Sequence, residues 1–155
     1  MRRLFVASLV LAVFPNVGTA QATQQISVKL VDGRNGRTLR NQIVEIWLGE
    51  KSLGMPNQTV RTNSDGIAFV PILAQQTSFV IAGESLVDCR IRVKYGKAAM
   101  DEAKTYKEEV YRFADVPAHG AVGANKCGKA TAQPISGQVV LFVRPPHWWE
   151  KAMWE

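Results

Sequence analysis

The chain of 155 residues has only two cysteines and two histidines. Cys89 and Cys127 do not form a Cys-x-x-Cys pair, and His119 and His147 are not spaced with them as the ligands of a zinc site. Asn63-Ser64-Asp65 lacks the further alternating ligands and the closing Glu of a calcium loop. The sequence therefore predicts no metal site and no cofactor.

Nucleophile motifs are missing too, since no Gly-x-Ser-x-Gly pattern occurs. A histidine acting as a general base needs an acid, a nucleophile or an orienting group at hydrogen-bond distance. The sequence reveals no such partner for His119 or His147. We therefore expect no catalytic residue and a protein that is not an enzyme.

Positive charge is not concentrated in one region. The formal charge is +6, from 19 Lys and Arg against 13 Asp and Glu, and it falls to +4 without Arg2 and Arg3. Acidic residues interrupt the basic ones, and no basic stripe is interleaved with aromatic residues. Nucleic-acid binding is not expected, whereas weak attraction to anionic surfaces remains open.

The chain has a single long apolar run, Leu4–Phe14, which follows Arg2-Arg3 and precedes Ala20-Gln21-Ala22. This order of regions is typical of a secretory signal peptide, which we place at residues 1–22. A buried N-terminal helix is the alternative. The run is too short to span a bilayer. We expect an exported protein, periplasmic or extracellular, that does not span the membrane after cleavage.

Both cysteines lie in the part predicted to be exported. An even cysteine count in an oxidising compartment predicts a disulfide between Cys89 and Cys127. A redox or metal pair is the alternative, and the spacing disfavours it. In the chain-entropy model, a bridge closing a loop of this size stabilises a fold by roughly 4 kcal/mol.

Several short segments alternate between apolar and polar residues, which predicts strands with one buried face. In Leu86–Tyr95 the alternation places Cys89 inward and Arg90 outward. The Asp65-Gly66 pair between two apolar runs in Thr59–Ile72 predicts a β-hairpin. The other predicted strands are Gln25–Val31, Gln42–Leu48 covered on both faces, Thr77–Ala82, an edge strand in Val110–Val116, and a central Gly137–Arg144.

Two segments carry no clear strand pattern. Gly96–Glu109 is helix-favouring in composition and is expected to form one or two helical turns or a loop. Ala118–Pro134 is irregular, and the predicted disulfide would fasten it to the sixth strand. The whole pattern predicts an all-β antiparallel sandwich, immunoglobulin-like or prealbumin-like, of about seven strands over residues 24–146. Residues 147–155 form a Trp-rich tail.

Two motifs carry a resemblance to a known family. Val28–Leu39, with Asp32 and a Gly-containing turn after a strand, resembles the opening of carboxypeptidase regulatory-like domains, which are transthyretin-like (prealbumin-type) sandwiches. Thr62–Phe69 resembles their Thr-Asp-x-x-Gly-x-Phe hairpin. The resemblance covers about Ile26 to Val93, implies a small exported bacterial protein, and carries no activity with it.

Hydroxyisourate hydrolase is an enzyme with this fold, so its catalytic motifs can be compared with this chain. Its opening strand carries a His where this chain has Lys29, and its chain ends in Tyr-Arg-Gly-Ser, which is missing here. The catalytic set is therefore not carried over to this chain.

The tail has three tryptophans within seven residues, Trp148, Trp149 and Trp154. They either fold back over the open end of the sandwich or form an exposed patch that binds a partner. We expect a structural or protein-binding module at the cell envelope or outside the cell. The alternative is a carbohydrate-binding module that uses the Trp cluster to stack on a glycan.

Overall fold

A computed structural model describes residues 25–49, 54–72, 77–90 and 109–151 of the chain. The predicted signal peptide over residues 1–22 lies outside the described residues, and so does Trp154. Residues 91–95 of the predicted sixth strand and nearly all of the segment expected to form helical turns also lie outside them.

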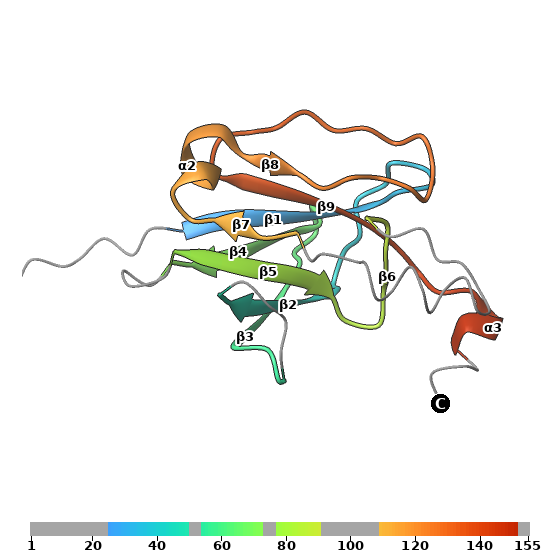
Figure 1. Ribbon diagram of the computed structural model, residues 1–155. Helices are drawn as coiled ribbons and strands as arrows, with labels where there is room; N and C mark the ends of the chain where they lie inside the picture. The colour runs from blue at the N-terminus through green and yellow to red at the C-terminus, as the bar shows by residue number, and fades with distance from the viewer. Residues whose placement is uncertain (1–24, 50–53, 73–76, 91–108, 152–155) are drawn as a thin grey trace, which may run out of the picture.

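Nine strands and two short helices make up the described part of the chain, and the strands form two sheets (Figure 1). The all-β sandwich prediction is therefore confirmed, with more strands than the seven expected. The five-stranded sheet has the order β4 (Ile67–Pro71), β1 (Gln25–Asp32), β9 (Gln138–Arg144), β6 (Val87–Asp88), with β8 (Ala121–Val122) also paired to β9. The four-stranded sheet has the order β3 (Gln58–Arg61), β2 (Ile43–Leu48), β5 (Ser78–Gly83), β7 (Tyr111–Arg112). The helices are α2 (Asp115–His119) and α3 (Trp148–Lys151).

Alternate residues of the long strands fill the space between the two sheets, as a period of two requires. In β1 the inward residues Ile26, Val28 and Leu30 are fully buried, whereas Ser27 and Lys29 are half-buried on the opposite face. The same core contains residues from the other long strands, namely Val44, Ile46, Phe79, Ile81, Val139, Leu141 and Val143. The alternation read from the sequence is therefore confirmed for β1.

The two sheets differ in strand direction. The four-stranded sheet is antiparallel throughout, as expected. In the five-stranded sheet β9 runs parallel to β1, from the Ser27–Gln138 pair to the Asp32–Val143 pair, and β8 is also parallel to β9. Parallel neighbours need a long crossover connection, and most of the domain lies between β1 and β9. The predicted antiparallel arrangement is thus wrong for these two pairs.

The predicted hairpin around Asp65-Gly66 is a turn between sheets. The turn itself forms, with Gly66 at a φ of +73° and the Asn63 side-chain oxygen accepting hydrogen bonds from the backbone N–H of Asp65 and Ile67. However, β3 pairs with β2 in one sheet and β4 pairs with β1 in the other. An Asp-Gly turn reverses the chain but does not determine which strands its arms join.

Thr62 shows why the two arms separate. Its side chain is buried, and its hydroxyl donates to the Leu39 carbonyl at 2.9 Å and accepts from the Gln42 backbone N–H at 2.9 Å. These bonds fasten the end of β3 to the connection between β1 and β2. The chain therefore leaves the four-stranded sheet directly after Thr62.

Strand β2 also differs in part from its prediction. It lies between β3 and β5, so it is central in its sheet. Only its inward residues Val44 and Ile46 are buried, and Trp47 on the other face is half-buried. An apolar residue at nearly every position therefore does not mean that both faces are covered.

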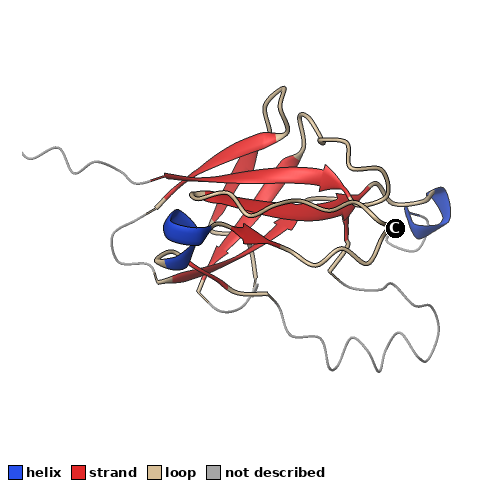
Figure 2. Ribbon diagram, turned by 90° about the horizontal axis from the view of Figure 1, so that it is seen from above, coloured by secondary structure: helices blue, strands red, loops and turns tan. Residues whose placement is uncertain are grey.

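The outer face of the five-stranded sheet is covered by residues 123–136, which we call the strap. The strap leaves β8, runs along the sheet to the turn after β1 and returns to β9, and Figure 2 shows it as a long loop lying over the strands. Beneath it lies a second, smaller cluster of buried residues formed by Val31, Cys89, Val140 and Phe142. The segment predicted to be irregular thus closes a small core of its own.

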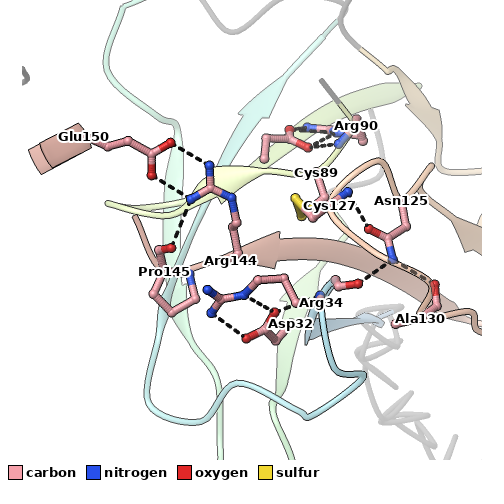
Figure 3. Close-up of a disulfide and its surroundings, with 12 residues drawn as sticks. Asp32, Arg34, Cys89, Arg90, Asn125, Cys127, Ala130, Arg144, Pro145 and Glu150 are labelled. Carbon is pink, nitrogen blue, oxygen red and sulfur yellow. Dashed lines mark hydrogen bonds and ion pairs between the residues drawn. A yellow bond between two sulfur atoms is a disulfide. The ribbon is translucent and has the colours of Figure 1, made fainter. Parts of the chain in front are cut away.

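The predicted disulfide is confirmed and holds the strap. Cys89 and Cys127 are bonded, with their Cα atoms 5.2 Å apart. Beside the bridge, the Asn125 amide donates to the Gly33 and Ala130 carbonyls, each at 2.8 Å (Figure 3). A Cβ on Gly33 would lie 2.5 Å from the Asn125 side-chain oxygen, so this position accepts only glycine without displacement.

Arg90 is buried, although the sequence placed it on the outer face of the sixth strand. The predicted facing is reversed after the regular strand ends at Asp88: Cys89, predicted to face inward, belongs to the small cluster beneath the strap, and Arg90 reaches the other sheet. Its guanidinium binds the Asp88 carboxylate, with Nε 2.7 Å from Oδ2, and donates to the Ile81 carbonyl at 2.8 Å. Arg90 therefore ties β6 of one sheet to β5 of the other.

Candidate functional site

The C-terminal tryptophans follow directly on β9, the most deeply buried strand. Pro145-Pro146 ends this strand, as predicted, because proline supplies no N–H for the ladder. The chain then forms the single turn α3, which carries Trp148 and Trp149. Because β9 is fixed in the core, its end determines the position at which the tryptophan-bearing segment starts.

A buried ion pair holds α3 against the end of β9. The Glu150 side chain is 2% exposed, and its two carboxylate oxygens accept from Nη1 and Nη2 of Arg144, each at 2.6 Å (Figure 3). The same carboxylate accepts from the His147 backbone N–H at 2.6 Å. A two-pronged pair of this kind fixes both position and orientation. The C-terminal segment is therefore docked on the sandwich.

The two described tryptophans lie in different environments. Trp148 is 81% exposed. Trp149 is half-buried, and its ring stacks nearly parallel to that of His147, with centroids 5.7 Å apart and planes 4° apart. Of the two arrangements considered for the tail, Trp148 therefore has the exposed one, and Trp149 is partly covered.

A second pair of opposite charges lies at the same end of the sandwich (Figure 3). The side chain of Asp32, at the end of β1, is 6% exposed and accepts from Arg34 Nη2 at 3.0 Å and from the Arg34 backbone N–H at 2.9 Å. Arg34 is 41% exposed, and the positive charge of Arg144 acts on it. The region around α3 thus presents one exposed indole and one accessible guanidinium.

The Asp32 carboxyl has a pKa below its ordinary value. Burial is the largest influence and raises this pKa, but the hydrogen bonds from the Arg34 side chain and backbone, its charge and the Asn35 amide together lower the pKa further than burial raises it. A carboxyl whose pKa is lowered on folding stabilises the fold above its unfolded pKa, near 3.9. That stabilisation is lost as the pH falls through the lower folded-state value.

We expect Asp32→Asn to lower the free energy of unfolding at pH 7 by roughly 1–3 kcal/mol, because it removes a charged acceptor of several hydrogen bonds. The gain in stability that wild type shows on raising the pH from about 2 to 5 should become smaller. Urea denaturation across this pH range measures both effects. The exposed Asp115→Asn serves as the control, and equal behaviour of the two variants would contradict the expectation.

The histidines considered as bases are both exposed. His119 ends α2, and His147 stacks on Trp149. Within the described part of the chain, no hydrogen bond joins either imidazole to a carboxylate or a hydroxyl, and no group of three His, Cys, Asp or Glu side chains is arranged to hold a metal ion.

The Arg144–Glu150 pair was not foreseen from the sequence. The two residues are six apart and separated by Pro145-Pro146, so no helical or strand spacing relates them. Only the turn made by the chain after the prolines brings the two side chains together. An Arg at the end of a predicted core strand and an acid in a Trp-rich tail are the only signals that the sequence contains.

No helix in the described ranges is long and apolar enough to cross a membrane. Comparisons of the chain with protein-family models, with curated proteins and with solved structures found no match.

Proposed function

We propose that this protein is an exported, non-catalytic β-sandwich module of the carboxypeptidase regulatory-like type. In this proposal it binds a protein partner at the cell envelope or outside the cell, with Trp148 as the anchor of the interface. The observation that carries the proposal is that Trp148 is 81% exposed on a segment fixed by the buried Arg144–Glu150 pair.

An exposed indole lacks the stabilisation that burial would give it. Burying a large apolar side chain contributes about 1.5–3 kcal/mol, which Trp148 does not gain within this chain. Tryptophan and arginine are the residues most enriched among those that dominate protein interfaces. Because α3 is docked in advance, a partner that covers Trp148 orders little additional backbone. Arg34, at the same end of the sandwich, is a second candidate contact.

Export is supported by the disulfide, because disulfides form and persist in oxidising compartments. The family assignment is supported by where its two motifs fall. Val28–Leu39 covers the end of β1 and the turn that follows, and Thr62–Phe69 covers the turn into β4. The first motif thus lies on a strand and turn of the kind that the resemblance implies, whereas the turn of the second motif joins the two sheets.

Carbohydrate binding is the second candidate, and the exposed face of Trp148 favours it, because sugar rings stack on exposed aromatic rings. Trp149 is less suited to this role, since one of its faces lies against His147. Binding of a protein and binding of a glycan by the same indole are expected to give different experimental results. One pair of experiments therefore distinguishes the two candidate functions.

We expect wild type, used as bait on the envelope fraction, to capture a partner protein that Trp148→Ala loses. With the purified partner, calorimetry should show that the substitution weakens binding by about tenfold or more, as for residues at the centre of an interface. Phe69→Ala is the matched control, because Phe69 is also an exposed aromatic, at 57%, but lies on β4.

Two results would overturn this proposal. One is equal capture by Trp148→Ala and wild type. The other is quenching of tryptophan fluorescence by a polysaccharide that Trp148→Ala abolishes, together with no partner in the pull-down, which would assign the site to glycans.

A further inference from the structure

The strap borders a cavity of about 260 Å³ on the outer face of the five-stranded sheet. Its floor is formed by β1 and β9, and its walls by the turn after β1 and by the returning half of the strap. Six of its lining residues matter for its chemistry, and none belongs to the C-terminal segment: Lys29, Thr38, Thr131, Ile135, Gln138 and Val140.

Among the described residues, Lys29 is the only charged one that lines this cavity. The pairing of β1 with β4 and β9 places it between Ile67 and Val140, so two apolar neighbours flank it in the sheet. Lys29 is half-buried, and among the described residues no carboxylate forms an ion pair with its ammonium. A charge partly removed from water without a counterion lowers stability, and an anion placed beside it would restore the balance.

The walls of the cavity are held in place from both ends of the strap. One end is held by the Cys89–Cys127 bridge. At the other end, the Gly137 backbone N–H donates to the Val116 carbonyl at 2.9 Å, and Gly120 packs so closely on Ile135 that a Cβ would lie 2.1 Å from the Ile135 carbonyl oxygen. The cavity is therefore formed before any ligand arrives, which reduces the ordering cost of binding.

We propose that this cavity binds a small carboxylate with a short apolar body. The carboxylate lies beside the Lys29 ammonium and accepts hydrogen bonds from the hydroxyls of Thr38 and Thr131, because ionised acceptors form the stronger bonds. The apolar body lies against Val140 and covers Ile135, which is 55% exposed.

The volume limits the size of the ligand. Pockets for drug-sized molecules begin at about 300 Å³. A cavity slightly smaller than this suits a short-chain carboxylic acid or the last residue of a peptide chain. Free acids and peptide C-termini share the carboxylate chemistry, so the test contains one probe of each kind.

The test uses the oxidised mature chain and four probes: 4-methylpentanoate, its neutral amide, an acetylated tripeptide ending in leucine, and the same tripeptide amidated at its C-terminus. Titrations followed by two-dimensional amide NMR are expected to shift signals of Lys29, Thr131 and Val140 with the two carboxylates. The two amides should bind at least tenfold more weakly. The stronger of the two carboxylates identifies a free acid or a chain end as the ligand class.

Variants separate Lys29 from general charge effects. Lys29→Gln is expected to weaken carboxylate binding at least tenfold, and Lys126→Gln, an exposed lysine on the strap, should leave it unchanged. The comparison of acid with amide on wild type needs no variant, so it decides the matter even if Lys29→Gln does not fold. Equal binding of acid and amide, or no shift at roughly 10 mM carboxylate, would overturn the proposal.

The result does not depend on the proposed protein interface. Trp148→Ala should leave carboxylate binding unchanged, because Trp148 does not line this cavity. The experiments can therefore contradict the proposed carboxylate site without affecting the proposed protein interface, and the reverse.

Discussion

Replacing both Cys89 and Cys127 by alanine is expected to lower the free energy of unfolding by about 4 kcal/mol in the chain-entropy model. The bridge joins residues 38 apart in the sequence, so without it the unfolded chain gains the freedom of a long loop. Cys89 is also fully buried, so the variant loses packing beneath the strap as well. Urea denaturation of wild type and variant at equal pH measures the difference.

The loss should also have a local signature. Without the bridge, the strap keeps the hydrogen bonds of Asn125 but loses its covalent tie to the sheet. Amide hydrogen exchange should then increase in residues 123–132 more than in β2 or β5. Wild type treated with a reductant should behave like the double variant. Identical denaturation midpoints for oxidised and reduced wild type would show that the bridge does not hold this fold together.

The second large effect is expected from Arg90→Ala, which should lower the free energy of unfolding by about 3–5 kcal/mol. The Arg90 side chain is 6% exposed, and that of its partner Asp88 is 18% exposed. Removing the guanidinium leaves the Asp88 carboxylate without its partner and the Ile81 carbonyl without its donor. Breaking one side of a buried ion pair is costly because the other charge stays buried.

Arg112→Ala provides the matched control, because Arg112 is an exposed arginine on the edge strand β7. Its replacement should change stability by no more than about 0.5 kcal/mol. A double-mutant cycle of Arg90→Ala with Asp88→Ala should be clearly non-additive, because the two residues form one network. If Arg90→Ala is no more destabilising than Arg112→Ala, the guanidinium is not a tie between the sheets.

Tyr111, on β7, lies beside the Arg90–Asp88 network between the two sheets. It is buried and packs on Phe79, with ring centroids 5.5 Å apart. Burial is the main reason why the pKa of its phenol is raised, so Tyr111 stays neutral where Arg90 and Asp88 are charged. The contact between the two sheets at this point thus contains the neutral phenol of Tyr111 and the charged pair Arg90–Asp88.

For the candidate functional residues, the local sequence predicts some features and the tertiary structure decides others. Three tryptophans in the tail mark that segment as unusual, but the exposure of Trp148 depends on the Arg144–Glu150 pair. Lys29 occupies an ordinary outward position in an alternating strand. It becomes a candidate binding residue only because the strap, more than ninety residues further along the chain, forms a wall beside it.

Local pattern alone determined where the long strands of this chain lie and, for β1, which residues face inward, because alternation follows from strand geometry whatever the partner is. The even number of cysteines likewise predicted the disulfide between them. Tertiary structure decided which strands pair, and so turned the Asp65-Gly66 hairpin into a turn between sheets and set β9 parallel to β1. It also buried Arg90 and left Trp148 exposed. The strand pairings depend on contacts between residues far apart in the sequence, where several pairings satisfy the same local pattern and only the total packing distinguishes them.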